Sequence, residues 1–133
     1  MSAVLLFLAV LSSSLSRADE ALKYEPAIVT LQGVLSLQDF AGPPNYESVA
    51  RGDELERYWI LTLPKSIQML GSSDDSLLYP QDRVKEIQLV CSEGCGKDFS
   101  FVVGAKVTLV GTLYAAFSGH HHKGVLMKVQ KVK

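Results

Sequence analysis

Apolar and polar residues alternate along five segments of the chain. In residues 27–37 (AIVTLQGVLSL), Val29, Leu31 and Leu35 share one parity, and Thr30 and Gln32 share the other. The same alternation recurs in four further segments, residues 57–63, 84–90, 105–114 and 124–132. A period of two indicates a β-strand with one buried face, and no segment keeps a helical period. The pattern predicts five strands and an all-β fold.

Two of these segments resemble each other. VTLQGVL at residues 29–35 recurs as VTLVGTL at 107–113, with Gly33 and Gly111 at matching positions. Glycines inside strands mark bends or bulges, and strands that coil through such bends can close a small barrel. We predict a five-stranded, OB-like Greek-key barrel with at most one short helix, within residues 96–103. An open β-sandwich is the alternative, and the longest loops are expected at residues 38–56 and 64–83.

The first 18 residues have the pattern of a signal peptide. Residues 3–11 are almost wholly apolar, and Ser16 and Ala18 provide the small side chains that a signal peptidase requires, so we expect cleavage before Asp19. A first core strand is the alternative interpretation. A cleaved signal peptide predicts export to the periplasm. The apolar run is too short to span a bilayer, so we expect no stable membrane insertion. Residues 19–133 then form a single β-barrel domain.

Charge and motifs exclude several classes of function. Cleavage removes Arg17 and no acidic residue, which leaves 12 basic residues against 14 acidic ones, an unfavourable balance for binding nucleic acid. The sequence contains no GxSxG, HExxH or phosphate-binding glycine loop. We therefore predict a protein that is not an enzyme and needs no cofactor.

Three consecutive histidines are the strongest hint of metal chemistry. In an extended chain His120 and His122 lie on one face and His121 on the other, so two imidazoles at most converge. A zinc site needs three or four ligands, so we predict no metal site and keep His120 and His122 as weak candidates. The alternative is that these imidazoles hydrogen-bond to a neighbouring loop. Cys91 and Cys95 are the only cysteines, and export predicts a disulfide between them, with two free thiols as the alternative.

The long loops are the expected contact surface for a partner. Two prolines stiffen GPPNYE (residues 42–47), which presents Tyr46 and Glu47 unless Tyr46 folds back to cap the barrel. The acidic run before Tyr58 is interpreted as a solvated surface cluster and not as a pair of catalytic carboxylates. The predicted partner-binding residues are Tyr46, Glu47, Asp53, Glu54, Glu56, Asp74 and Asp75.

Five segments carry a resemblance to a known family: YEPAIVTLQGVL (24–35), GPPNYE (42–47), YWILTL (58–63), IQLV (87–90) and GAKVTLVGTLYAAFSGHHH (104–122). Together they resemble a bacterial family of small exported proteins of unknown function. Similar sequences are expected to carry cysteines near Ala21 and Gln68 that could pair, and this chain has neither.

The chain also looks like an immunity protein of a type VI secretion system. This resemblance implies that its partner is a secreted lipase effector of the phospholipase D type, whose basic active site an acidic loop would occlude. Two alternatives stay open: a metal-binding envelope protein that uses His120 and His122, and a structural or ligand-binding barrel of the cell envelope.

Overall fold

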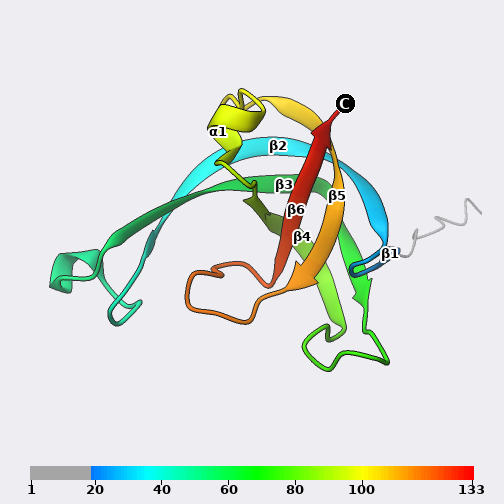
Figure 1. Ribbon diagram of the computed structural model, residues 1–133, viewed down its shortest axis with the longest axis horizontal. Coiled ribbons are helices and arrows are strands. Elements are labelled where there is room, and N and C mark those ends of the chain that lie inside the picture. Colours follow the sequence, from blue (N-terminus) through cyan, green and yellow to red (C-terminus); the bar gives the residue numbers. More distant parts are fainter. Residues whose placement is uncertain (1–18) are drawn as a thin grey trace, which may run out of the picture.

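The computed structural model describes residues 19–133, so the predicted signal peptide lies outside the described residues (Figure 1). This part of the chain is almost entirely strands and loops. Its elements are β1 (Glu20–Lys23), β2 (Ile28–Ala41), a 3-10 turn (Val49–Arg51), β3 (Leu55–Leu70), β4 (Gln81–Val90), α1 (Cys95–Asp98), β5 (Lys106–Ala115) and β6 (Val125–Val132).

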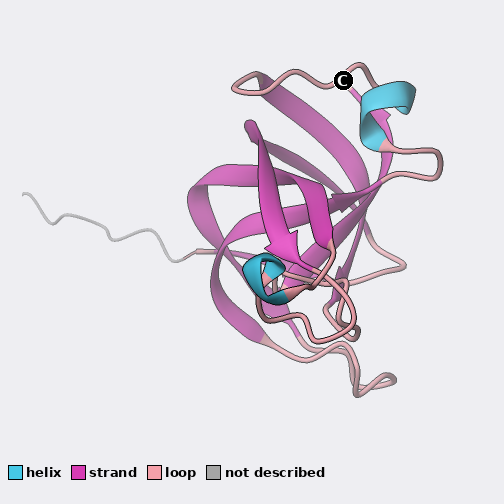
Figure 2. Ribbon diagram, turned by 90° about the vertical axis from the view of Figure 1, so that its left-hand side faces the viewer, coloured by secondary structure: helices cyan, strands magenta, loops and turns pink. Residues whose placement is uncertain are grey.

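Strands β2 to β6 close a five-stranded barrel. Strand β3 pairs with β2 and β4, β5 pairs with β2 and β6, and the parallel pair β4–β6 completes the circle. The short helix α1 lies between the third and fourth barrel strands, at the edge of the barrel in Figure 2. The prediction of an all-β, OB-like barrel with one short helix is confirmed.

The two similar segments pair with each other. In the antiparallel β2–β5 pair, Leu31 lies opposite Leu109, and both are buried in the core. A Cβ at Gly111 would overlap a backbone carbonyl of β6, where the β5–β6 register shifts by a bulge. Gly111 is therefore required at this close approach of two strands, as its position inside a strand predicted.

Strands β2 and β3 continue past the barrel wall as a two-stranded arm, which we define as residues 36–59. The β2–β5 pairing ends at Val34, and the β3–β4 pairing begins only at Ile60. Figure 1 shows the arm projecting to one side, ending in a tip formed by residues 42–54. The predicted loop 38–56 was therefore too long, because the chain still forms strands outside the barrel.

The other differences from the sequence prediction also follow from pairing. Strand β3 runs through Pro64 to Leu70, because the β3–β4 register shifts between Thr62 and Ile67 and no ladder bond from Pro64 is needed. Strand β1 was not predicted, and it pairs in parallel with the end of β3. By contrast, the disulfide between Cys91 and Cys95 is present as predicted, and Cys95 is the first residue of α1. No helix within residues 19–133 has the length and apolar character needed to cross a membrane.

Candidate functional site

The tip of the arm is organised by one buried carboxylate. Asp53 is 6% exposed, and its two carboxylate oxygens accept the backbone N–H groups of Asn45, Glu47 and Ser48 at 2.9–3.0 Å. These hydrogen bonds, led by the one from Ser48, lower the pKa of Asp53. Its prediction as a surface residue was wrong, since the carboxylate faces the backbone of the tip. Asp53 instead fixes the conformation of the GPPNYE segment.

Glu56 joins the arm to the loop between β5 and β6, which we call the histidine loop (residues 116–124). One carboxylate oxygen lies 2.5 Å from His120 Nδ1 and the other 2.9 Å from His122 Nε2. The Glu56 side chain is only 13% exposed, so its interpretation as a solvated surface charge was also wrong. The sequence places these partners 64 and 66 residues apart, and the fold brings them together.

Opposing effects set the ionisation of Glu56. Burial works to raise the pKa of its carboxyl, but the hydrogen bonds and charges of His122 and His120 outweigh burial, so the pKa is lowered. The group is thus a carboxylate at neutral pH, and a carboxylate can only accept hydrogen bonds. It follows that His120 carries a hydrogen on Nδ1 and His122 carries one on Nε2.

The histidine loop is also held by Gln88 of β4, on the barrel wall. The Gln88 side chain donates to the carbonyl of His120 at 3.0 Å and accepts from the N–H of His122 at 2.7 Å. On the side of the arm, the His122 ring stacks on the ring of Phe40 with 4.3 Å between centroids. Gln88 and Ile60 are opposite each other in the β3–β4 pair, and both are almost completely buried. The loop therefore covers part of the outer wall of the barrel.

His121 points to a different environment from its two neighbours, as the alternation predicted. Its Nδ1 accepts the N–H of Phe117 at 3.0 Å, and its ring meets Phe117 and Tyr114 edge to face. Burial, and then the proximity of His120 and His122, lower its pKa. His121 is therefore a packing residue at the base of the loop.

Tyr46 closes the contact between the two motifs. Its ring lies against Gly119, and its hydroxyl is 3.4 Å from His120 Nε2. The backbone of Tyr46 is left-handed, with a φ of 56°, which is uncommon for a residue with a side chain. The ring folds back onto the histidine loop and is still 38% exposed. The two predictions were that Tyr46 is presented to a partner or that it folds back to cap the barrel. Its ring does part of each, since it contacts the histidine loop and also faces solvent.

Nδ1 of His120 and Nε2 of His122 face Glu56, whereas Nε2 of His120 faces the hydroxyl of Tyr46, so the imidazoles do not converge on a shared point. Within residues 19–133 no group of three or more His, Cys, Asp or Glu side chains has the arrangement of a metal site. In this structure the imidazoles link the arm to the barrel by hydrogen bonds to Glu56, which is the second residue of β3.

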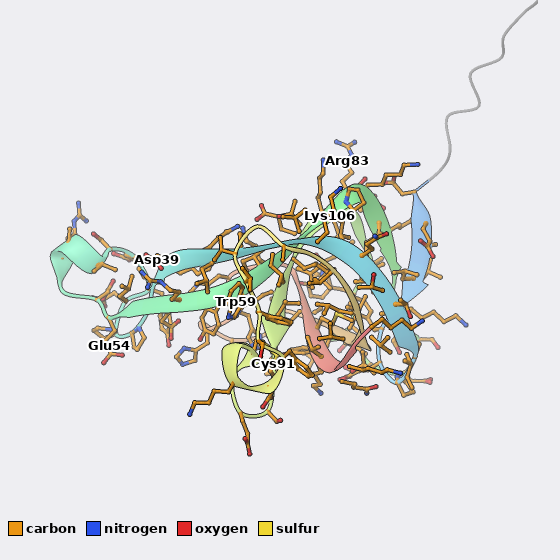
Figure 3. All side chains as sticks on the ribbon, turned by 90° about the horizontal axis from the view of Figure 1, so that it is seen from above. Asp39, Glu54, Trp59, Arg83, Cys91 and Lys106 are labelled. Carbon is orange, nitrogen blue, oxygen red and sulfur yellow. A yellow bond between two sulfur atoms is a disulfide. The ribbon has the colours of Figure 1, made fainter. Side chains whose placement is uncertain are left out.

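The remaining predicted contact residues fall into two separate places. Glu47 and Glu54 are exposed on the tip, and Figure 3 shows Glu54 at the far end of the arm, beyond Asp39. Asp74 and Asp75 are also exposed but lie in the β3–β4 loop, at the opposite end of the 16-residue strand β3. A strand advances about 3.3 Å per residue, so the two acidic pairs do not form one surface.

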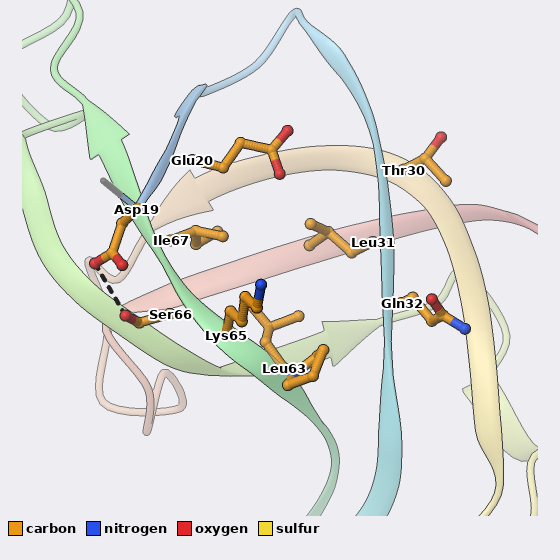
Figure 4. Close-up of a pocket in the computed structure, with 10 residues that line it drawn as sticks. Asp19, Glu20, Thr30, Leu31, Gln32, Leu63, Lys65, Ser66 and Ile67 are labelled. Carbon is orange, nitrogen blue, oxygen red and sulfur yellow. Dashed lines mark hydrogen bonds between the residues drawn. The ribbon is translucent and has the colours of Figure 1, made fainter. Parts of the chain in front are cut away.

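A hollow of about 430 Å³ lies between β1, β2 and β3 (Figure 4). Its walls combine apolar Leu31, Leu63 and Ile67 with polar groups such as Lys65, and Ser66 donates to Asp19 at its rim. It opens where β2 and β3 are not paired, since their pairing begins only at Val34 and Thr62 and residues 30–32 of β2 lie before it. Neither the histidine loop nor the arm lines this hollow, so the two sequence motifs do not meet there.

Comparisons with known proteins give one partial match. No curated protein matches the chain. Residues 86–133 match the family model of DUF4431, a domain of unknown function. The matched range includes the histidine loop, and the arm lies outside it. The second half of the barrel is thus similar to a domain family to which no function is attached.

Proposed function

We propose that the protein is a non-enzymatic binding protein of the periplasm, an immunity protein that occludes the active site of a secreted lipase effector. The effector class we propose is a lipase of the phospholipase D type, as the resemblance of the sequence implies. The observation that carries the proposal is the arm, which projects from the barrel as a pre-formed element with fixed side chains.

The arm has the properties of an inhibitory loop. Asp53 fixes the tip from inside, and Glu56 fixes the arm against the histidine loop, so little conformational freedom is left to lose when a partner binds. The surface of the tip combines exposed apolar groups with negative charge. Its exposed residues include Tyr46, Glu47, Val49 and Glu54, with Leu55 next to it at the start of β3, and Arg51 is its one exposed basic residue.

This composition suits the active site of an enzyme that binds phosphodiesters. Such a site must attract its anionic substrate with positive charge, and the same positive charge would attract the carboxylates of Glu47 and Glu54. Aromatic and aliphatic groups such as Tyr46 and Val49 would provide the apolar contact at the centre of the interface. The protein then acts by filling the site, without turnover of its own.

The test is inhibition of the effector by purified mature protein. We expect a stoichiometric complex and loss of phosphodiester hydrolysis. The charge reversal Glu47→Lys with Glu54→Lys should weaken inhibition at least about tenfold, the effect of losing roughly 1.4 kcal/mol of binding free energy. The matched control is Asp74→Lys with Asp75→Lys, the same charge change at the other end of β3, which should inhibit like the wild type.

Two results would overturn the proposal. One is the absence of any complex between the mature protein and a purified lipase effector of the phospholipase D type. The other is the reverse mutational pattern, in which the control pair abolishes inhibition and the tip pair does not, because the arm would then not be the inhibitory element.

A further inference from the structure

The contact between arm and histidine loop places a hydroxyl, an imidazole and a carboxylate in sequence. Glu56 accepts the hydrogen on Nδ1 of His120 at 2.5 Å, and Nε2 on the other side of the same ring faces the hydroxyl of Tyr46 at 3.4 Å. The order carboxylate, imidazole, hydroxyl is the arrangement by which proteins activate an oxygen nucleophile. We propose that Tyr46 is an activated acyl acceptor, a covalent modification site for reactive acyl donors such as activated esters and acyl imidazoles.

The protonation states required for this chemistry follow from the contacts. Because ionised Glu56 holds the hydrogen on Nδ1, a neutral His120 presents the lone pair of Nε2 to the phenol. The second oxygen of Glu56 is held by His122, which is 12% exposed and stacked on Phe40, so the carboxylate cannot turn away easily. His120 is thus the base, and Glu56 and His122 are positioning residues.

The reacting group is also accessible and held in place. Tyr46 is 38% exposed, and the side chain of His120 is 53% exposed, so a donor can approach from solvent. The left-handed backbone of Tyr46 and the contact of its ring with Gly119 direct the hydroxyl towards the imidazole. The distance of 3.4 Å is long for a hydrogen bond, as catalytic hydrogen bonds often are before a reactant binds.

The step balances without an oxidant or a reductant. The phenol oxygen of Tyr46 attacks the carbonyl carbon of the donor, and the phenol proton passes to His120 Nε2. The bond from the acyl carbon to its leaving group breaks, and the leaving group takes up one proton as His120 returns to its neutral form. The products are O-acyl Tyr46 and the protonated leaving group.

Tyr79 provides a control within the same molecule. It is 43% exposed, slightly more than Tyr46, and its hydroxyl has no hydrogen-bond partner among residues 19–133. The mature protein is treated briefly with N-acetylimidazole at about pH 7.5, and peptide mass mapping follows acetylation at both tyrosines. We expect Tyr46 to react at least about tenfold faster than Tyr79. This is less than the roughly 10²–10⁴-fold of strong general-base catalysis, because the hydroxyl and the imidazole are 3.4 Å apart.

Variants then separate activation of Tyr46 from its simple exposure. In Glu56→Gln the amide can donate to His120 Nδ1, which would move the ring hydrogen to Nε2 and remove the base. This variant and His120→Gln should reduce Tyr46 to the rate of Tyr79, whereas Glu93→Gln, at an exposed carboxylate outside the arm and the histidine loop, should change neither rate.

The outcomes decide the proposal whether or not the variants keep their loops in place. Equal rates of Tyr46 and Tyr79 in the wild type would overturn it, and so would a Glu56→Gln variant in which Tyr46 keeps its wild-type rate. A fast Tyr46 that His120→Gln leaves unchanged would also refute the role of the imidazole. None of these readouts depends on the proposed lipase partner.

Discussion

Removal of the Glu56 carboxylate should weaken the protein by an amount that the two histidines determine. In Glu56→Ala, His122 loses the acceptor for a ring N–H in a side chain that is 12% exposed, and an unsatisfied buried donor costs about 1–3 kcal/mol. His120 is half-exposed and can turn to water, so its loss adds at most about 1 kcal/mol. We expect the free energy of unfolding to fall by about 1–4 kcal/mol, with the larger part from His122.

Equilibrium unfolding in urea measures this change, and a neighbouring residue provides the control. Glu54 is exposed and lies two positions before Glu56, so Glu54→Ala should stay within about 0.5 kcal/mol of the wild type. Hydrogen exchange locates the effect, since amides of residues 117–123 should exchange faster in Glu56→Ala and those of β5 should not. A loss below about 0.5 kcal/mol in Glu56→Ala would refute the view that Glu56 holds arm and loop together.

The pH dependence of the same variant has a definite sign. The pKa of Glu56 lies below its ordinary value of 4.5 in the folded protein. A lowered pKa stabilises the fold above the ordinary value, and this contribution is lost as the pH falls through the folded-state value. The difference in unfolding free energy between wild type and Glu56→Ala should therefore shrink from about pH 5.5 to about pH 3. A difference that grows over this interval would contradict the assignment.

Three further changes test the tip, the barrel and the first strand. Asp53→Ala should speed hydrogen exchange in residues 45–48 and leave the barrel amides unchanged. If the tip amides of the variant exchange as slowly as in the wild type, Asp53 does not fix the tip. Gly111→Ala should lower the unfolding free energy by about 1–3 kcal/mol, whereas Gly96→Ala, whose Cβ would meet its nearest atom at 3.9 Å, should not. Cysteines replacing Ala21 and Gln68, which are opposite each other in the β1–β3 pair, should form a disulfide worth about 2–4 kcal/mol in unfolding measured with and without reductant.

The barrel could be predicted from the sequence because its signal is local. One buried face gives each strand its alternation, and the matching glycines mark the places where strands must approach closely. The arm gave only a weak signal, because its half-buried face carries polar residues such as Gln38 and Glu56, while Leu37 and Leu55 lie on the exposed face. Cross-strand contacts hold it there, among them the ion pair of Asp39 with Arg57. Strand β1 (EALK) likewise has no alternation and depends on its pairing with β3.

The site could be predicted only in part, for a different reason. The alternation of His120 and His122 is a property of neighbouring residues, and it correctly separated them from His121. That their common partner is Glu56 depends on how the arm and the histidine loop meet in space, and no pattern along the chain records it. Asp53 was misjudged because an acidic residue in a polar run gives no sign that backbone N–H groups surround it.

The GPPNYE and GHHH segments are best understood as two halves of one contact. Ile60 is completely buried, yet it lies outside the core of the barrel, on the parity opposite to the core residue Leu61. It shares the outer wall with Gln88, which binds the histidine loop. The loop therefore forms a second, small core on the outside of the barrel, and the arm rests on it through Phe40, Tyr46 and Glu56. A change in either segment must then alter the other, so the direction of the arm is set by the loop as much as by its own strands.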